Sequence, residues 1–283
     1  KTHDREVLTA SIGALIQHDS SVHVWSPFAE EKWALITSID DFSRKILFAN
    51  FVPKDTTWAH IQAVQTLTQS YGIPLRYYVD SLRVFRFVQG RDSVWRKHVL
   101  QTDDVDTQWG KMMRLFGVDV TYALCPQAKG RVERPYQRLQ DRIVRTCTLD
   151  NISAQEAVRA VPQEEVDRHN HHQVHSKTKK IPDIRFPEAH TTGNSRFPPF
   201  STPKPYASPN DVLCLRETRA VNSYRRISLF NHTIEVPNVE LHEDFEPHPV
   251  PNLPKQRTEI RIWSYEKMAH SLAFRLHRFR VHL

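Results

Sequence analysis

The order of strand-like and helix-like segments in residues 14–80 constrains the fold of this chain more than any other feature. Apolar residues recur every three or four positions from Trp58 to Tyr71, which predicts a helix that Thr56 or Thr57 can cap and Gly72 can close. Four apolar runs between polar or turn residues predict strands: 14–19, 33–39, 46–51 and 75–79. The first of these strands ends in Asp19, and the fourth is followed by Asp80.

Further elements follow along the chain. Residues 88–106 are polar and mixed in charge, and we interpret them as an insertion. A helix at 108–116 and a strand at 118–122 come next. From Lys129 onward one helical face is apolar, and a capping-box pattern predicts another helix over residues 153–169. The first of these two helices carries a row of arginines on a second face: Arg134, Arg138, Arg142 and Arg145.

The composition changes after this helical region. Many of the chain's 18 prolines lie within residues 170–210, which predicts an extended linker. Short apolar runs then predict a small all-β module: 212–215, 227–230, 233–236, 259–263 and 272–274. We therefore predict four parts: an N-terminal linker (1–13), a catalytic core (14–175), a proline-rich linker (176–210) and a C-terminal β-barrel-like DNA-binding module (211–283).

Charge and cysteine content restrict the class of function. The chain of 283 residues has a formal net charge of +7, which favours an acidic partner such as nucleic acid. Its three cysteines include no CxxC pair, so a disulfide framework or a cysteine-ligated zinc site is not expected. No apolar run reaches ~18 residues, so we predict no membrane span. The chain starts at Lys1 rather than Met, and we expect it to be part of a longer protein.

Histidines gather at His169, His171, His172 and His175 and suggest a zinc site as one interpretation. No cysteine stands at zinc-finger spacing from them, so zinc is not our prediction.

Three carboxylates are candidates for metal-dependent chemistry on a polyanion: Asp19, Asp80 and Glu133. Cleavage of a phosphodiester by two metal ions requires a few converging carboxylates, and Mg²⁺ prefers oxygen ligands. These three can converge if the strands that end in the two aspartates are neighbours. An ordinary surface salt bridge remains the alternative for each. Among the other acids, Asp40 and Asp41 are expected to form a turn, and Asp141 is expected to pair with arginines.

Four motifs make a specific resemblance. They are Ile-Gln-His-Asp with the residues to Trp25, Tyr-Val-Asp-Ser at residues 78–81, Pro-Gln-Ala-Lys-Gly-Arg-Val-Glu-Arg at 126–134, and Leu-Gln-Asp-Arg at 139–142. Together they resemble the integrase-core DDE transposases, which are relatives of retroviral integrases. The ISNCY-like bacterial insertion sequences look nearest. The resemblance covers about residues 10–190, and the 126–134 string is its most specific part.

The resemblance implies an RNase H-like α/β fold, a mixed five-stranded sheet flanked by helices, followed by a small all-β (SH3-like) module. It implies that Asp19, Asp80 and Glu133 hold Mg²⁺ or Mn²⁺, two ions per active site. One ion would activate water and then a DNA 3′-hydroxyl, and the other would stabilise the leaving 3′-oxygen. The implied protein is a bacterial cytoplasmic, nucleoid-associated transposase that cleaves transposon ends and joins them to target DNA as a homodimer or higher oligomer.

Basic residues near Glu133 are the predicted DNA contacts. Phosphate contacts of this kind give affinity and salt dependence rather than sequence readout. We expect Arg131 and Gln137 to lie near the scissile phosphate. The full predicted set is Lys129, Arg131, Arg134, Gln137, Arg138 and Arg142.

Some positions depart from the family pattern. Ser20 stands where the family usually has Gly, Val24 where it has an acid, and Ser81-Leu82 where near relatives tend toward Arg-His. The interval from Asp80 to Glu133 is also long, which agrees with the insertion. These departures support an alternative, a non-catalytic DNA-binding or regulatory derivative of an integrase-core protein.

Overall fold

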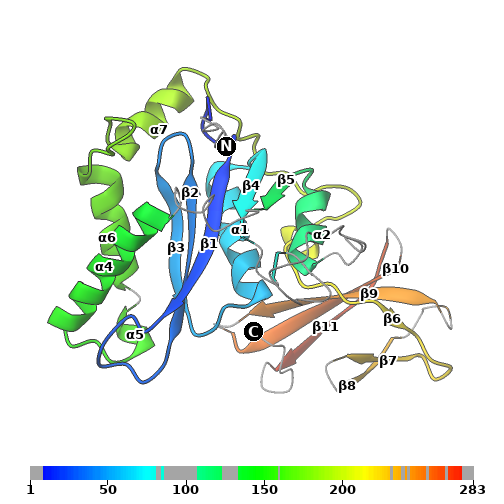
Figure 1. Ribbon diagram of the computed structural model, residues 1–283. Coiled ribbons are helices and arrows are strands. Elements are labelled where there is room, and N and C mark those ends of the chain that lie inside the picture. Colours follow the sequence, from blue (N-terminus) through cyan, green and yellow to red (C-terminus); the bar gives the residue numbers. More distant parts are fainter. Residues whose placement is uncertain are drawn as a thin grey trace, which may run out of the picture. The chain divides into compact units, whose positions relative to one another are not determined.

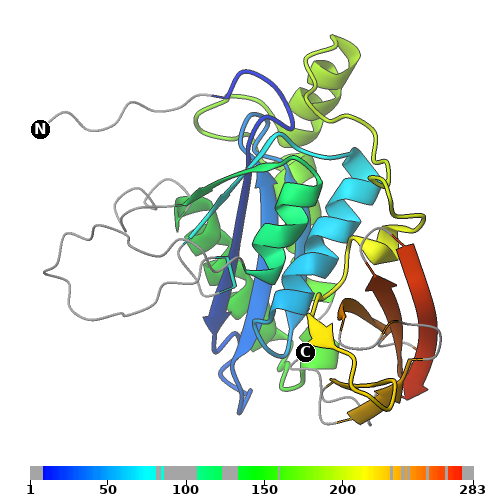
Figure 2. The same ribbon diagram turned by 90° about the vertical axis from the view of Figure 1, so that its right-hand side faces the viewer.

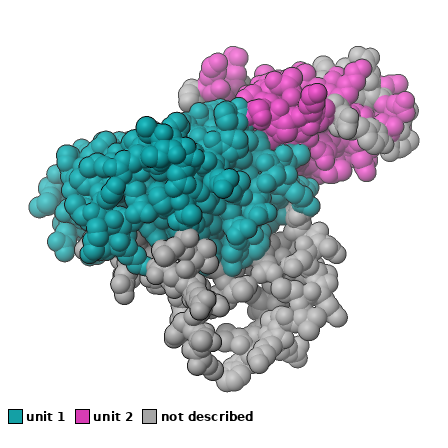
Figure 3. Space-filling view, turned by 90° about the horizontal axis from the view of Figure 1, so that it is seen from above, with its two compact units in different colours: residues 1–55, 62–200 teal, residues 56–61, 201–283 magenta. Residues whose placement is uncertain are grey.

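The computed structural model describes most of the chain. It covers residues 9–80, 84–85, 107–122, 133–158, 160–229, 232–236, 240, 243–252, 255–264 and 267–275. Residues 133–138, 155–156, 270 and 274–275 are described by their backbone alone. The chain divides into two compact units (Figure 3), residues 1–55 with 62–200 and residues 56–61 with 201–283. No helix in these ranges is both long and apolar enough to cross a membrane.

The first unit is built on a five-stranded mixed sheet. Its strands are β1 (Ile16–His23), β2 (Trp33–Asp40), β3 (Ile46–Val52), β4 (Arg76–Val79) and β5 (Asp119–Tyr122). They lie in the order β3-β2-β1-β4-β5. The pairs β1–β2 and β2–β3 are antiparallel, and β1–β4 and β4–β5 are parallel. This topology confirms the predicted RNase H-like fold class.

Helices cover both faces of this sheet. The helical elements are α1 (Thr57–Tyr71), α2 (Gln108–Leu115), α4 (Glu133–Leu149), α5 (Gln155–Val158), α6 (Ala160–Asp167), the π-helical turn η1 (Arg168–His172) and α7 (Pro182–Thr191). Helices α1 and α2 lie on one face, and α4 and α6 lie on the other (Figures 1 and 2). All eight residues of β2 are buried because this strand has a neighbour on each side and helices on both faces.

Helix α4 packs on the sheet through one apolar stripe. Leu139, Ile143 and Cys147 recur every four residues, so they lie on one side of the helix, and all three are buried. They share a core cluster with Leu35 and Phe51 of the sheet. Burial of a Leu or Ile side chain stabilises a fold by roughly 1.5–3 kcal/mol. The predicted apolar face of this helix is therefore what fixes it to the sheet.

The first strand is longer than predicted. β1 pairs with β2 from Ile16 opposite Asp40 to His23 opposite Trp33, so Asp19 lies inside the strand and not at its end. The prediction of a strand that ends at Asp19 is wrong because the polar residues that follow give no strand signal. Pairing with β2, the next strand along the chain, keeps them extended.

The predicted linker of residues 176–210 is corrected in its first part. Residues 182–191 form α7, with Pro182 at the first helical position, where the missing N–H costs nothing. After α7, the Arg196 amide donates to the Ile12 carbonyl (2.8 Å) and the Ile73 amide donates to the Pro198 carbonyl (3.0 Å). Residues up to 200 therefore pack on the first unit. The predicted helix at 153–169 is also divided, into α5, α6 and the start of η1.

The second unit contains the predicted all-β module. Its strands are β6 (Arg219–Ala220), β7 (Arg226–Leu229), β8 (His232–Glu235), β9 (Asp244–Asn252), β10 (Arg257–Ser264) and β11 (Lys267–Arg275). A four-stranded sheet has the order β11-β10-β9-β6, and β7 pairs with β8. The short 3-10 turn η2 (Pro209–Asp211) precedes these strands.

Strand β9 was missed because it contains Pro247, Pro249 and Pro251. Its prolines occupy alternate positions, so their ring nitrogens all face the same side of the strand. The carbonyls of Pro249 and Pro247 accept from the amides of Leu215 and Glu217 (3.3 and 3.1 Å), which places that side away from β10. The ladder with β10 therefore loses no donor. Residues 215–217 run beside β9, where their amides donate to proline carbonyls but the prolines have no amide hydrogen to donate in return. The strand predicted at 212–215 therefore does not form.

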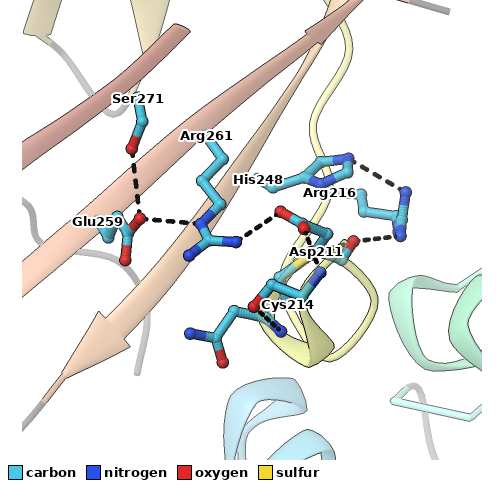
Figure 4. A network of polar contacts seen from close by, with 9 residues as sticks. Asp211, Cys214, Arg216, His248, Glu259, Arg261 and Ser271 are labelled. Carbon is cyan, nitrogen blue, oxygen red and sulfur yellow. Dashed lines mark hydrogen bonds and ion pairs between the residues drawn. The ribbon is translucent and has the colours of Figure 1, made fainter. Parts of the chain in front are cut away.

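A buried polar network holds η2 against β9 and β10 (Figure 4). Arg216 donates to the Asp211 carbonyl (2.7 Å), to the Tyr206 hydroxyl (3.1 Å) and to His248 Nε2 (3.1 Å). Arg261 donates to Asp211 Oδ1 (2.8 Å). His248 Nε2 also lies 3.4 Å from Glu246 Oε2, so this nitrogen stands between a guanidinium and a carboxylate. Burial lowers the pKa of His248, and the charge of Arg216 lowers it further.

Candidate active site

Asp19 and Asp80 lie at the same level on neighbouring parallel strands. Within the β1–β4 pair, Ile16 is opposite Tyr77 and Gln17 is opposite Tyr78. This register, continued by two residues, places Asp19 opposite Asp80. Neighbouring strands are about 4.8 Å apart, and residues opposite each other point to the same face. The two predicted carboxylates are therefore neighbours, which is the condition that the sequence left open.

Both carboxylates lie on the face of the sheet that α4 covers. Side chains alternate between the faces of a strand. Ser21 is opposite Leu35, which packs in the cluster under α4, so Asp19, two residues earlier, is on that side. The ring of Tyr77 meets His18 on the other face (5.7 Å between centroids). Asp80 lies three residues after Tyr77 and is therefore on the same face as Asp19.

Helix α4 begins at the third predicted carboxylate, Glu133. The far end of the helix is fixed beyond β1, because the Ser26 hydroxyl donates to the Ile152 carbonyl. From there α4 runs back along the sheet, and its first turn lies toward the middle of the sheet (Figure 1). The Glu133 side chain lies outside the described set, so its convergence with the two aspartates stays a prediction.

The paired carboxylates suit a hard divalent cation. Two like charges 5 Å apart repel by about 3 kcal/mol at an effective dielectric constant near 20. A cation between them removes this repulsion, and Mg²⁺ and Mn²⁺ prefer carboxylate oxygens. The Ser20 amide donates to Asp19 Oδ1 (3.0 Å). Among the side chains that the structure describes, no three His, Cys, Asp or Glu residues are grouped to hold an ion.

The other aspartates near β2 have structural roles. Asp40 is fully buried, and its carboxylate accepts from the Gly13 amide (2.9 Å) and from the amide and hydroxyl of Ser43 (2.8 and 2.6 Å). Burial raises the pKa of Asp40 despite these bonds. Asp41 pairs with Arg44 (2.8 Å). The turn-forming interpretation of these two residues is confirmed.

A groove with arginine side chains opens between α4, α6 and η1. The Glu165 carboxylate lies in it, 2.8 Å from Arg168 Nε and 3.9 Å from Arg142 Nε. The groove has a volume of about 530 Å³, and its lining residues are Asp141, Arg142, Arg145, Thr146, Leu149, Glu165, Arg168 and Gln173. Among the predicted DNA contacts, Arg142 is thus the one whose side chain the structure describes.

The other predicted DNA contacts are not placed by side chain. Lys129 and Arg131 lie outside the described residues. Arg134, Gln137 and Arg138 belong to α4, where only their backbone is described. Sequence reasoning missed Arg168 as a neighbour of Arg142. The two come together only through the packing of η1 beside α4, for which the sequence carries no local signal.

The histidine-rich stretch connects η1 to its surroundings. The Asn170 amide donates to the Ile46 carbonyl and accepts from the Ile46 amide (both 2.9 Å), which pairs it with the start of β3. His169 Nε2 lies 3.0 Å from the Arg44 carbonyl. His171 Nδ1 lies 2.7 Å from Asp183 of α7. These contacts give the stretch a role in packing.

Comparison with known proteins gives two curated relatives. No family model matches the sequence. The chain is 26% identical over 224 residues to a Sinorhizobium fredii protein named as a transposase, y4bF, with 78% of this chain and 43% of that protein covered. It is 34% identical over 143 residues to the transposase for insertion sequence IS1202 of Streptococcus pneumoniae, with 50% of this chain and 29% of that protein covered. The chain spans less than half the length of each.

The solved structures with a similar fold include viral integrases. The HTLV-2 integrase catalytic core domain in complex with magnesium is 15% identical, with a TM-score of 0.44, and covers 64% of this chain and 99% of its own. The integrase of the simian T-cell lymphotropic virus intasome is 12% identical, with a TM-score of 0.49, over 95% and 82%. The BIV integrase catalytic core is 18% identical, with a TM-score of 0.42, over 64% and 99%.

Proposed function

We propose that the chain is the catalytic part of a bacterial insertion-sequence transposase, because it is similar to two curated bacterial transposases and has a mixed five-stranded sheet of the order β3-β2-β1-β4-β5. The proposed enzyme is a DDE-type polynucleotidyl transferase. It would cleave DNA at transposon ends and join the resulting 3′-hydroxyls to target DNA, acting in the cytoplasm as a homodimer or larger assembly. Its closer placement among ISNCY-like elements stays a prediction.

One observation carries this proposal: β1 and β4 are parallel neighbours with Gln17 opposite Tyr78, and this register, continued by two residues, puts Asp19 and Asp80 opposite each other on one face. A pair of surface acids has no reason to occupy one level of a sheet, because their repulsion costs free energy. Functional sites are the places where such costs are retained. The pair also lies on the side of α4, whose first residue is the third proposed ligand.

In the proposed site Asp19, Asp80 and Glu133 would hold two Mg²⁺ or Mn²⁺ ions. These ions, when bound, supply activation of the attacking hydroxyl and stabilisation of the leaving 3′-oxygen. Asp19 lies within β1 and Asp80 directly follows β4, so both ligands would be carried by the sheet before DNA binds. Preorganisation of this kind reduces the reorganisation needed at the moment of reaction.

The arginine-lined groove supports a role for α4 in holding DNA. Arg142 and Arg145 are exposed on α4, and Arg168 stands across the groove from them. Three arginines against Asp141 and Glu165 leave one net positive charge. Contacts of these side chains with phosphates would orient the duplex without reading its sequence. Together with Lys129, Arg131, Arg134, Gln137 and Arg138 they would form the proposed DNA surface.

A strand-transfer assay with candidate end DNA and Mg²⁺ or Mn²⁺ tests the proposal. Asp80→Asn should reduce strand transfer to background and leave DNA binding largely intact. Asp119→Asn is the matched control, because Asp119 lies on the adjacent strand β5 but is exposed and paired with Arg76 (3.0 Å). Full activity of Asp80→Asn would overturn the metal assignment.

The second candidate is a non-catalytic derivative that binds DNA, suggested by the sequence departures. Ser20 weakens this alternative, because its hydroxyl donates to Asp55 Oδ2 (2.7 Å) on the face opposite Asp19. Its amide bond to Asp19 is one that Gly would also make. Ser81 and Leu82 lie outside the described residues. A protein that binds DNA but takes up no Mn²⁺ in excess metal would favour the alternative.

A further inference from the structure

One carbonyl oxygen joins three segments of the chain close to the proposed site. The Phe85 carbonyl accepts from the Thr107 hydroxyl (3.3 Å) and from the Tyr122 hydroxyl (3.2 Å). Thr107 is also the N-cap of α2, since its side-chain oxygen accepts from the Gly110 amide (3.0 Å). Tyr122 is the last residue of β5. The carbonyl therefore connects the segment after β4 to the start of α2 and to the end of β5.

The Phe85 side chain is anchored as firmly as its carbonyl. The ring is only 1% exposed, and it meets the rings of Trp109 (4.9 Å) and His18 (5.6 Å) edge to face. His18 in turn lies 2.8 Å from the Ser38 hydroxyl through Nδ1, which links it to β2. We call Phe85, its ring partners His18 and Trp109, and its donors Thr107 and Tyr122 the Phe85 hub.

Each proposed metal ligand is connected to this hub by a short piece of chain. Asp19 directly follows His18, Asp80 precedes Phe85 by five residues, and Glu133 follows Tyr122 by eleven. His18 and Asp19 point to opposite faces of β1, so the hub lies behind the carboxylates and does not touch the reacting groups. Along the sequence Asp80 therefore lies between the end of β4 and Phe85, five residues later.

We propose that the Phe85 hub is a positioning element that sets the Asp80 carboxylate at the distance from Asp19 that a divalent ion requires. This inference rests on the proposed function. A carboxylate at the end of a four-residue strand can shift unless the chain beyond it is fixed. Metal sites lose affinity when the groups that orient their ligands are removed. Within the hub, the Tyr122 hydroxyl is the most specific group to remove, because it donates a hydrogen bond directly to the Phe85 backbone carbonyl.

Titration with Mn²⁺, followed by electron paramagnetic resonance, tests this proposal on the metal-free protein. Tyr122→Phe removes one donor and keeps the ring. We expect it to weaken Mn²⁺ binding about fivefold, the effect of one hydrogen bond. Tyr206→Phe is the matched control, since its hydroxyl makes a comparable bond to Arg216 (3.1 Å) in the other unit. Its Mn²⁺ affinity should equal that of the wild type.

The outcomes separate this inference from the proposed function. Wild-type Mn²⁺ affinity in Tyr122→Phe, with binding lost in Asp80→Asn, would overturn the positioning role and leave the metal site intact. Wild-type affinity in Asp80→Asn would overturn the metal site itself. Thr107→Val provides a second variant if Tyr122→Phe does not fold, with the same expected loss, and Thr107→Ser should restore binding because it keeps the hydroxyl.

Discussion

Replacement of Asp80 by Asn should make the metal-free protein more stable while it removes the response to metal. The register of β1 and β4, continued by two residues, puts Asp19 and Asp80 at neighbouring positions, and two charges separated by the spacing of adjacent strands, about 5 Å, repel by at most about 3 kcal/mol at an effective dielectric constant of 20. Both residues are half-buried, so solvent and salt reduce this figure, and we expect a gain of about 1–2 kcal/mol. For a unit of this size, each kcal/mol raises the melting temperature by roughly 2–4 °C.

Thermal unfolding by circular dichroism, in EDTA at low ionic strength, measures this gain. The difference between Asp80→Asn and the wild type should shrink in ~1 M salt, where the Debye length is ~3 Å. Added Mn²⁺ should then raise the melting temperature of the wild type alone, because an ion that binds only the folded state stabilises it by mass action.

Asp119→Asn is the control for a change of net charge. Asp119 is exposed and paired with Arg76, and such surface pairs are worth ~0–1 kcal/mol. This variant should be unchanged or slightly less stable, and it should keep its response to Mn²⁺. A lower melting temperature for Asp80→Asn in EDTA at low salt would refute the inference that the two carboxylates are neighbours.

Two further predictions concern the second unit. Burial lowers the pKa of His248 in the folded state, whereas the unfolded value is about 6.5. The unfolded chain therefore binds more protons as the pH falls below about 6.5, and the unfolding free energy of this unit should decrease there; urea titrations at several pH values should show this slope in the wild type but not in His248→Gln. Pro249→Ala should change the urea midpoint little because position 249 faces away from β10. Val250→Pro should lower the unfolding free energy by at least roughly 1–3 kcal/mol, since its amide faces β10 and is lost; equal effects of the two would contradict the assigned direction.

The sequence was sufficient where local periodicity decides the structure. The strands at 33–39 and 46–51 and the helix at 57–71 match β2, β3 and α1 closely, because their apolar residues follow the period of each element. The sequence was insufficient where pairing between separate segments decides. β1 extends past Asp19 only because β2 lies beside it, and β9 forms despite its prolines because only one of its sides needs donors.

The candidate site was also predictable from local sequence patterns only in part. Motifs in the sequence identified Asp19, Asp80 and Glu133 as candidates, but the relation of Asp19 to Asp80 depends on the register of two parallel strands that are separated in sequence by two other strands and a helix. No local pattern encodes such a register. Arg168 is a similar case, since it meets the groove of Arg142 only through the packing of η1.

The alternate prolines of β9 have a consequence for encounters between copies of this protein. The strand's outer side offers carbonyls but has no amide hydrogen at positions 247, 249 and 251. A strand from another molecule that displaced residues 215–217 would find acceptors and no donors there. It would form only half of the hydrogen bonds of a normal β-ladder. Edge-to-edge association of β-strands, the usual route to aggregation and domain swapping, is therefore disfavoured along this side. Copies of the chain can then meet at high local concentration without their β-modules exchanging strands along this side.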